Sequence, residues 1–413
     1  MQFIGIIAEY NPFHCGHVWQ LRELRRRYPD IDGIIVAMSG SFTQRGTPCI
    51  MDKWRRARHA VAGGADLVLE LPFVFACRSA QDFARGGISL LSRLGVVSHL
   101  AFGTEADETA PLMEIALQID SDPVQKKIYE YIDAGFSYAA ALSHALMDGG
   151  VSEDMFRAPN NILAIEYLRA LHQFAPQITP ILVQRKSVQH SDVHLYAGIT
   201  SASSIRTAIR RIPPAWNLLE KSLLPLVFSD LHTAYLFGLP EENELLRLLR
   251  YELLIRNTSE LKNICGVAEG IENRLVDCLK TTSEYNDLIK KVSTKRYPQS
   301  RIARLIVHLL LCLQKAQTTA FDKAGVSYIR PLAFNTQGRD ILRQIKKYTK
   351  LPIVTRTAAF LTSGQRSVPS SELSLLQQML SFDTRATELR ILTLLTEHKD
   401  TCRTDFITSP QLL

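Results

Sequence analysis

Residues 3–17 read FIGIIAEYNPFHCGH, and this stretch decides the fold. The six apolar or small residues from 3 to 8 predict a buried strand. Pro12 breaks that strand and fixes a turn, and a helical pattern follows. Two histidines, His14 and His17, therefore stand where a helix begins, directly after a buried strand.

Short apolar runs alternate with helical patterns over the first 200 residues. Further strands are predicted at 33–38, 66–71, 99–103 and 181–183. Continuous apolar strands separated by helices are typical of a parallel sheet that is covered on both faces. Residues 108–175 are mostly helical in pattern and predict an insertion before the last of these strands. The fold class is therefore α/β, with a Rossmann-like parallel sheet.

The second half of the chain has a different character. Leucine-rich helical patterns dominate from residue 213 onward, and strand signals are sparse. The helices are expected at 243–254, 269–279, 302–315, 338–347 and 371–379. We place a boundary at Pro213, which predicts a catalytic α/β domain over 1–212 and a mostly α-helical domain over 213–413.

Composition is that of an ordinary globular protein, with 46% apolar and 22% charged residues in 413. The longest apolar runs fall far short of the roughly 20 residues that a membrane span needs. No basic stretch precedes the first apolar run, so no signal peptide is predicted and a cytoplasmic location is expected. Seven widely spaced cysteines include no C-x-x-C pair, and no metal site is predicted.

The positive charge is unevenly distributed. Residues 1–211 hold 21 basic and 21 acidic residues, whereas residues 212–413 hold 27 and 20, so the net charge of +7 belongs to the second half. This asymmetry favours a polyanionic partner for the second half, although a solvated helical surface would have the same composition.

The position of the two histidines indicates chemistry on phosphate. Ligands of an open parallel sheet bind beyond the carboxyl ends of its strands. A helix that begins there points N–H groups and its positive dipole end at the ligand, and Gly16 allows close approach. Imidazoles at 14 and 17 can stabilise charge on a departing pyrophosphate. The alternative is that one histidine caps the helix and the other is packed.

Residues 200–206 read TSASSIR and precede a short helical stretch at 207–211. Hydroxyl groups and Arg206 at a helix start make a second anion site, although Ser and Thr there are also ordinary helix caps. This segment resembles the S-x-x-I-R signature found late in the catalytic domains of H-x-G-H nucleotidyltransferases.

Further stretches narrow the resemblance to the bacterial tRNA(Met) cytidine acetate ligase family within that superfamily. They are MSGSFTQRG at 38–46, DKWR at 52–55, DLVLELP at 66–72, FGTE at 102–105, PNNIL at 159–163, STKRY at 293–297 and YIRPL at 328–332. The similarity covers most of the chain and is weakest after about residue 355.

This resemblance implies an enzyme that activates acetate with ATP as acetyl-adenylate, releasing pyrophosphate. The acetyl group then passes to the wobble cytidine of elongator tRNA(Met), giving N4-acetylcytidine. It implies catalytic roles for His14, His17 and Arg206, with Mg²⁺ on the phosphates. It implies ATP contacts at Ile7, Ala8, Glu9, Tyr10, Asn11, Pro12, Phe13, His14, Cys15, Gly16, His17, Val18, Trp19, Gln20, Gly103, Asn160, Arg185, Ser203 and Ser204.

Three of these ATP contacts lie far along the chain from the histidines. Gly103 ends a predicted strand, where a bare backbone lets adenine or ribose approach, and a turn glycine is the alternative. Asn160 and Asn161 open a helix, and we favour Asn160 as the ligand because of the family match. Arg185 follows the last predicted strand, where a guanidinium suits phosphate better than a core position.

Basic residues of the second half are the expected tRNA contacts. The run from 290 to 304 contains no acidic residue and supplies Lys290, Lys291, Lys295, Arg296, Arg301 and Arg304. Tyr297 within it could stack on a base. A second cluster at 339–350 supplies Lys346 and Lys347. Elongator tRNA(Met) and acetate are the expected partners, with no membrane and no obligate protein partner.

Two other functions compete with this interpretation. Another adenylyltransferase of the same superfamily, acting on a small phosphate or carboxylate substrate, would share the histidine motif. An RNA-binding protein with a degenerate nucleotide domain would have lost it, and the intact His14, Gly16, His17 and Arg206 oppose that interpretation.

Overall fold

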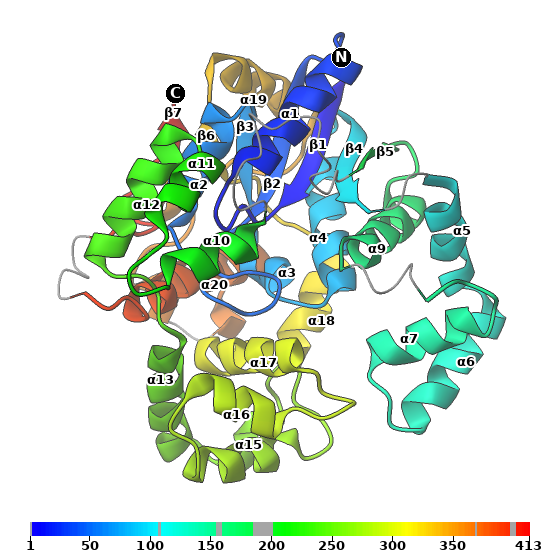
Figure 1. Ribbon diagram of the computed structural model, residues 1–413, viewed down its shortest axis with the longest axis vertical. Coiled ribbons are helices and arrows are strands. Elements are labelled where there is room, and N and C mark those ends of the chain that lie inside the picture. Colours follow the sequence, from blue (N-terminus) through cyan, green and yellow to red (C-terminus); the bar gives the residue numbers. More distant parts are fainter. Residues whose placement is uncertain (1, 106–108, 154–158, 185–200, 368–369, 397–401) are drawn as a thin grey trace.

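The computed structural model describes residues 2–105, 109–153, 159–184, 201–367, 370–396 and 402–413. A seven-stranded sheet forms its centre, with the strand order β5-β4-β1-β2-β3-β6-β7 (Figure 1). The strands are β1 (Phe3–Ala8), β2 (Gly33–Ser39), β3 (Leu67–Leu71), β4 (Val97–Thr104), β5 (Thr179–Gln184), β6 (Pro331–Phe334) and β7 (Gln411–Leu412). The five strands predicted from the first half of the sequence are all confirmed.

The first five strands are parallel to one another, and β1 lies between β2 and β4. The chain adds β2 and then β3 on one side of β1, and afterwards adds β4 and β5 on the other side. This reversal of strand order creates a topological switch point at the carboxyl end of β1. Alternate side chains enter different cores: Ile4 and Ile6 face one side, and Phe3 and Ile7 face the other. Both faces are buried, as the continuous apolar runs predicted.

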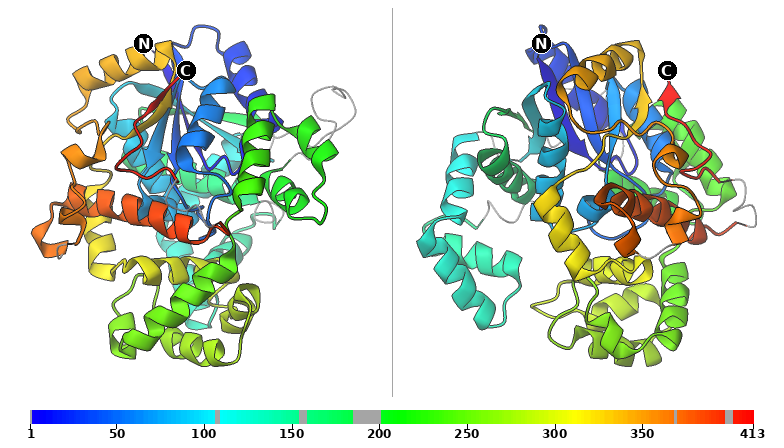
Figure 2. Two further views of the ribbon diagram at one scale, coloured as in Figure 1. Left: turned by 90° about the vertical axis from the view of Figure 1, so that its left-hand side faces the viewer. Right: turned by 180° about the vertical axis from the view of Figure 1, so that it is seen from behind.

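Helices cover both faces of the sheet (Figure 2). On one face lie α1 (Cys15–Arg27), α2 (Lys53–Ala62), α10 (Ala202–Ile209), α11 (Trp216–Ser222) and α12 (Pro225–Phe237). The other face is covered by α4 (Ala80–Arg93), α9 (Pro159–Phe174) and α19 (Thr336–Tyr348), and the same core includes residues of α3 (Phe73–Ala76), α18 (Lys315–Ala324) and α20 (Leu375–Leu392). Short 3-10 turns occur at Thr357–Ala359, Gln365–Ser367 and Ser370–Glu372.

Two groups of helices lie beyond the carboxyl ends of the parallel strands, in the lower half of Figure 1. One belongs to the predicted insertion and contains α5 (Thr109–Ile119), α6 (Asp122–Asp133) and α7 (Tyr138–Met147). The other, which we call the helical lobe, contains α13 (Glu242–Ile255), α14 (Thr258–Leu261), α15 (Ile271–Lys280), α16 (Tyr285–Val292) and α17 (Gln299–Leu311). Both groups face the edge of the sheet where ligands of this fold class bind.

The second half of the chain is mostly helical, as predicted, but it also returns to the sheet. Strand β6 pairs antiparallel with β3, and β7 extends the sheet beyond it. The sequence analysis expected few strands after residue 213 and named neither of these. They are four and two residues long, which is too short for a period-two pattern to appear. Residues from both sides of the predicted boundary at 212 build one sheet, and the division into two domains stays a prediction.

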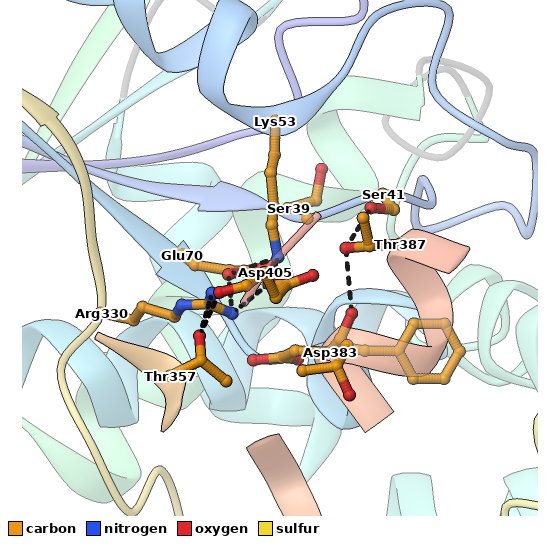
Figure 3. Close-up of polar contacts among 12 residues, drawn as sticks. Ser39, Ser41, Lys53, Glu70, Arg330, Thr357, Asp383, Thr387 and Asp405 are labelled. Atoms are coloured by element: carbon orange, nitrogen blue, oxygen red, sulfur yellow. Dashed lines mark hydrogen bonds and ion pairs between the residues drawn. The ribbon is translucent and has the colours of Figure 1, made fainter. Parts of the chain in front are cut away.

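A buried network of charges joins the two halves of the chain (Figure 3). Lys53 Nζ lies 2.6 Å from a carboxylate oxygen of Glu70 and 2.6 Å from one of Asp405. Arg330 Nη1 lies 3.0 Å from Glu70 and 2.5 Å from Asp405. All four side chains are at most 4% exposed. Two cations and two anions, from 53 to 405 in the sequence, thus neutralise one another inside the protein.

Asp405 belongs to this network and Asp383 lies near it. The two carboxyl groups differ in pKa because their neighbours differ. Burial raises the pKa of Asp405, but Arg330 and Lys53 outweigh that effect and hold it at about 2. Burial and the charge of Glu70 raise the pKa of Asp383 to about 7. Asp383 accepts from the backbone N–H of Phe73 at 2.7 Å and from the hydroxyl of Tyr328. Opposite charge therefore decides which carboxyl stays ionised.

Among the described residues, no helix is both long enough and apolar enough to cross a membrane.

Candidate active site

The turn after β1 is held by polar contacts from the loop after β2. Tyr10 adopts a left-handed conformation with φ of 48°, and the bond between Asn11 and Pro12 is cis. Asn11 Oδ1 accepts from the backbone N–H of Ile50 at 2.8 Å. Glu9 Oε1 accepts from the backbone N–H of Gln44 at 2.6 Å. Loops that follow β2 thus fix the turn that leads into α1.

His14 and His17 form a reciprocal cap at the start of α1. His14 is the N-cap residue, and its Nδ1 accepts from Gly16 N at 3.1 Å. His17 Nδ1 accepts from His14 N at 3.2 Å. The two rings stack with their centroids 3.8 Å apart. The alternative that a histidine caps the helix is confirmed, since both side chains do so, and the role of the pair in phosphate chemistry stays a prediction.

These capping contacts determine which ring nitrogen of each histidine can donate a hydrogen bond to a ligand. Because both Nδ1 atoms accept hydrogen bonds, a neutral ring carries its proton on Nε2. Tyr10 and Phe13 pack against the His17 ring, with centroids 4.6 and 5.4 Å from it, and restrict its orientation. Two N–H donors beside a helix N-terminus form a site suited to anionic oxygen atoms.

Arg206 meets this turn from the far end of the catalytic half. It lies on α10, and its Nη1 donates to the backbone oxygen of Asn11 at 2.6 Å. Burial lowers the pKa of Arg206, and the negative charge of Glu9 opposes that shift. The late motif and the H-x-G-H turn, 195 residues apart, are therefore in direct contact.

The serines of the late motif lie at the first turn of α10. The helix runs from Ala202 to Ile209, so the sequence analysis, which expected it at 207–211, placed it too late. Ser201 is the cap, and its Oγ accepts from Ser204 N at 3.1 Å. The hydroxyls of Ser203 and Ser204 lie 3.0 and 2.8 Å from Ser201 Oγ, and both residues are exposed. Their hydroxyls are available to a ligand at this helix start.

The other residues of the expected ATP segment divide by exposure. Ile7, Phe13 and Val18 are buried in the cores, so only their backbone can contact a ligand. The half-buried positions are Ala8, Glu9, Cys15, Gly16, Trp19 and Gln20. Burial raises the pKa of the Cys15 thiol, which is the opposite of what an activated nucleophile requires.

The carboxyl end of β4 forms the other side of the candidate site. Gly103 lies in β4 opposite Val183 of β5. Asn161 is buried, and its Oδ1 accepts from Thr104 Oγ1 at 2.7 Å and from Glu105 N at 3.1 Å, so it ties α9 to β4. Asn160 donates to the carboxylate of Glu105. Asn160 remains the better candidate for a ligand contact, and Arg185 lies outside the described residues.

Arg56 is a site residue that the sequence analysis missed. Its side chain has no exposed area, and it donates to the backbone oxygens of Glu9, Ser39, Gly40 and Met51. It therefore joins the ends of β1 and β2. One sequence signal could have identified Arg56. It lies on the same face of a short helix as the apolar Ala57 and Ala60, where a charged side chain is unexpected.

The basic run of 290–304 is only partly a free surface. Lys290 and Lys295 are exposed. Lys291 donates to the backbone oxygen of Thr281 at 3.1 Å, and Arg296 lies 2.6 Å from Glu269. Four cations near α16 remain close to solvent, but two of them already have protein partners.

Tyr297 and Arg301 of the same run contact each other. The Arg301 guanidinium lies over the Tyr297 ring at 4.2 Å, and the ring is 6% exposed. The tyrosine hydroxyl donates to Ala268 O at 3.0 Å. The expectation that Tyr297 stacks on a base is therefore wrong, because its ring belongs to the core of the lobe.

Arg304 faces the sheet and not the outer surface. Its Nη1 donates to the backbone oxygen of Gln44 at 3.3 Å, and burial lowers its pKa. The α17 backbone at Arg304 comes so close to Gly46 that a Cβ there would lie 2.6 Å from its nitrogen. Helix α17 thus packs directly on the loop after β2.

The second basic cluster lies elsewhere on the molecule. Lys346 and Lys347 are exposed in the last turn of α19. Gln337 at the start of α19 donates to the backbone oxygen of Asp32, which directly precedes β2. The helix therefore lies at the amino ends of the strands, whereas α16 lies beyond their carboxyl ends (Figure 1). The structure does not bring the two predicted clusters together.

Comparison with known proteins agrees with this geometry. Residues 1–404 match the HIGH Nucleotidyl Transferase family. The tRNA(Met) cytidine acetate ligase of Thermoanaerobacter sp. (strain X514) is 37% identical over 367 residues, which are 87% of this chain and 90% of that protein. The enzyme of the same name from Syntrophomonas wolfei subsp. wolfei is 35% identical and covers 99% of both chains.

A solved structure extends the similarity to three dimensions. The crystal structure of Thermotoga maritima TmcAL bound with alpha-thio ATP superposes with a TM-score of 0.87, at 30% identity, over 100% of both chains. Sheet order, histidine cap and relatives together define a nucleotidyltransferase of the H-x-G-H class. Within that class, the chain belongs to the tRNA(Met) cytidine acetate ligase family.

Proposed function

We propose that the protein activates acetate with ATP as acetyl-adenylate and transfers the acetyl group to the wobble cytidine of elongator tRNA(Met), giving N4-acetylcytidine. The observation that carries the proposal is the contact between Arg206 and the turn that holds His14 and His17. Family membership supports the substrates, because the relatives are named for tRNA(Met) and cytidine acetate ligation.

The first step places new negative charge where the site holds donors. An acetate oxygen attacks the α-phosphorus of ATP, and the bond to the bridging oxygen of pyrophosphate breaks. The Nε2–H groups of His14 and His17, the N-terminus of α1 and Arg206 surround the region where that charge develops. Charge stabilisation and positioning of this kind supply most of the rate enhancement in phosphoryl-transfer sites.

Mg²⁺ belongs to the proposal as a companion of the nucleotide. Among the described residues, no group of three His, Cys, Asp or Glu side chains could hold a metal ion. Mg²⁺ commonly binds through substrate phosphates and water with few protein ligands. We therefore propose that the ion arrives bound to ATP. When bound, it would neutralise charge on the leaving pyrophosphate.

The helical lobe is the proposed tRNA surface. It lies beyond the same edge of the sheet as the H-x-G-H turn and carries the exposed Lys290 and Lys295. Its α17 packs on the loop that supports Glu9 through Gln44. A tRNA on this lobe would approach the candidate site from its open side. We place the reaction in the cytoplasm, where tRNA and ATP are present.

A direct test supplies the protein with ATP, Mg²⁺, isotope-labelled acetate and unmodified elongator tRNA(Met), followed by digestion and mass spectrometry. Labelled N4-acetylcytidine that requires ATP and disappears in His17→Ala is the expected result. Acetate-dependent exchange of pyrophosphate into ATP without labelled cytidine would limit the function to adenylate formation. Absence of both products would contradict the proposal.

A further inference from the structure

Transfer of an acetyl group to an amine requires that a proton leave the nitrogen. The amino group of cytidine attacks the acetyl carbon, and one of its N–H bonds must break as AMP departs. A positioned side chain that accepts this proton accelerates such a step by roughly 10²–10⁴-fold. The structure therefore has to supply an acceptor beside the phosphate site.

The two histidines are not suited to this role. Nδ1 of His14 accepts from Gly16 N, and Nδ1 of His17 accepts from His14 N. A neutral ring held in this way carries hydrogen on Nε2 and has no further lone pair to take a proton. Both rings are fixed as donors by the same capping contacts that begin α1. Arg206 is a cation and cannot accept.

Glu9 is the acidic group of this turn. It is the only Asp or Glu between residues 1 and 22, and it directly follows β1. Among the described residues, one backbone N–H donates to its Oε1, from Gln44 at 2.6 Å, which orients the carboxylate and leaves acceptor capacity on both oxygens. Its charge acts on Arg206, so it belongs to the same cluster as the H-x-G-H turn.

Among the described residues, Glu105 is a second carboxylate near the site, and its position is less suitable. It follows β4, and the side chain of Asn160 donates to it. That places it with Gly103 and Asn160 at the end of β4, the strand next to β1, and outside the H-x-G-H turn itself. Glu9, by contrast, shares a turn with the residues that would surround the α-phosphate.

Glu9 is also connected to the helical lobe. Gln44, whose N–H orients Glu9, accepts at its backbone oxygen from Arg304 of α17 at 3.3 Å. The side chain of Gln44 donates to Arg78 O at 2.7 Å, and Arg78 forms two contacts with Asp322 at 2.6 and 3.0 Å. The carboxylate is thus held from the side on which the lobe lies.

We infer that Glu9 is the proton acceptor in acetyl transfer, and that Gln44 and Arg304 position it. The cytidine nitrogen forms a bond to the acetyl carbon, the bond from that carbon to the phosphate oxygen breaks, AMP leaves as the anion, and the amine proton passes to Glu9. This inference rests on the proposed function and names the residue that serves its second step.

The test compares two acceptors for the same acetyl-adenylate. Enzyme is supplied with ATP, Mg²⁺ and labelled acetate, and then mixed with either unmodified elongator tRNA(Met) or hydroxylamine. Hydroxylamine is a strong nucleophile that reacts with acyl-adenylates without a basic side chain. The ratio of acetylcytidine to acetohydroxamate, measured in single turnovers, isolates proton removal from adenylate formation. Glu105→Gln is the matched control, since it removes a second carboxylate that the described residues place near the site.

In Glu9→Gln, the ratio is expected to fall about 100-fold relative to the wild type. Glu9→Asp keeps a carboxylate and is expected to recover part of the ratio, which a purely structural role would not predict. In Glu105→Gln the ratio should stay within a few-fold. The inference would be overturned if the ratio is unchanged in Glu9→Gln, or if it falls further in Glu105→Gln than in Glu9→Gln. A wild-type enzyme that gives acetohydroxamate but no acetylcytidine would instead contradict the proposed function.

Discussion

Among single residues, Lys53 has the most demanding environment. Its ammonium group is fully buried and neutralises Glu70 and Asp405 together with Arg330. Lys53→Met would leave two buried carboxylates with one cation, and loss of one partner from a buried pair destabilises by roughly 3–5 kcal/mol. Urea denaturation should show this loss. Lys280→Ala is the control, since its pair with Asp277 is largely exposed and should change stability by at most about 1 kcal/mol.

The raised pKa of Glu166 on α9 makes the stability of the protein depend on pH. It is 4% exposed, and burial raises its pKa to about 7, although Arg169 acts in the opposite direction. A carboxyl group whose pKa is raised by folding favours the folded state while it is protonated. Its contribution is therefore complete below the pKa of the unfolded chain and is lost as pH rises through 7.

The variant Glu166→Gln tests this pH dependence. The amide has the shape of the protonated acid at every pH, so the variant should match the wild type near pH 4. At pH 8 it should have the larger free energy of unfolding, by up to roughly 3 kcal/mol. Denaturant titrations at a series of pH values measure both. Equal slopes of stability against pH in the two proteins would contradict the assignment.

Tyr10 carries a buried hydroxyl with no hydrogen-bond partner among the described residues. Burial also raises its pKa, so the group stays protonated. Leaving a buried polar group unpaired costs about 1–3 kcal/mol. Tyr10→Phe removes that penalty and should leave the melting temperature of the free protein unchanged or higher. A clear decrease would mean that the hydroxyl has a partner in solution.

The contact between α17 and the loop after β2 is the element on which the site most depends. Gly46 has φ of 83°, and a Cβ on it would lie 2.6 Å from Arg304 N. Gly46→Ala should separate the helix from the loop and thereby loosen Gln44, which orients Glu9. Hydrogen exchange of residues 41–48 should become faster, and acetyl transfer should slow.

Gly135 provides the control for that substitution. It has a similar φ of 93°, but nothing lies within 4 Å of where its Cβ would be. Gly135→Ala therefore has the same backbone strain of about 1 kcal/mol without the collision. If both variants slow acetyl transfer equally, general destabilisation explains the effect and the contact with α17 does not.

The sequence predicted best those strands and helices whose apolar residues form a regular pattern over many positions. Strands β1 to β5 have continuous apolar runs, and α13, α15, α17 and α19 lie within a few residues of their predicted bounds. The failures have local causes. Strand β6 has four residues, and α20 starts at Leu375, four residues after the predicted start, and continues to Leu392. Short strands and helix ends depend on tertiary neighbours, which spacing alone does not reveal.

The candidate site was predictable where a motif carries its own geometry. His14 and His17 are three residues apart, so the start of one helix brings them together. Arg206 could be paired with them only through the family resemblance, because contact across 195 residues leaves no local signal. The limit of sequence reasoning is shown by the buried Arg56 and the half-buried Arg304. Both donate to backbone oxygens of other segments, and backbone oxygens have no signature in sequence.

At the scale of the whole molecule, the two basic clusters make different predictions for tRNA binding. Lys290 lies on α16 and Lys295 follows that helix, whereas Lys346 and Lys347 lie on α19. Helix α16 lies beyond the carboxyl ends of the strands and α19 at their amino ends (Figure 1). Lys290→Ala with Lys295→Ala should lower the slope of log affinity against log salt by about 1 for each phosphate that these lysines neutralise. Filter binding at several KCl concentrations measures the slope.

The matched pair for this comparison is Lys346→Ala with Lys347→Ala. It removes the same charge from the other end of the sheet and should leave the slope unchanged if tRNA occupies the lobe alone. An equal decrease in both pairs would mean that the tRNA extends around the molecule from one edge of the sheet to the other.

The buried pairing of Lys53 with Asp405 has a consequence for how the protein is made. The carboxylate that neutralises Lys53 is translated 352 residues after it. Until that segment leaves the ribosome, the catalytic half contains an interior charge without its full complement of partners. The nascent chain should therefore be sensitive to proteases and dependent on chaperones until residue 405 has been translated. Messages that stall before the codon for Asp405 should yield degraded products, even though the residues of the H-x-G-H turn are translated well before it.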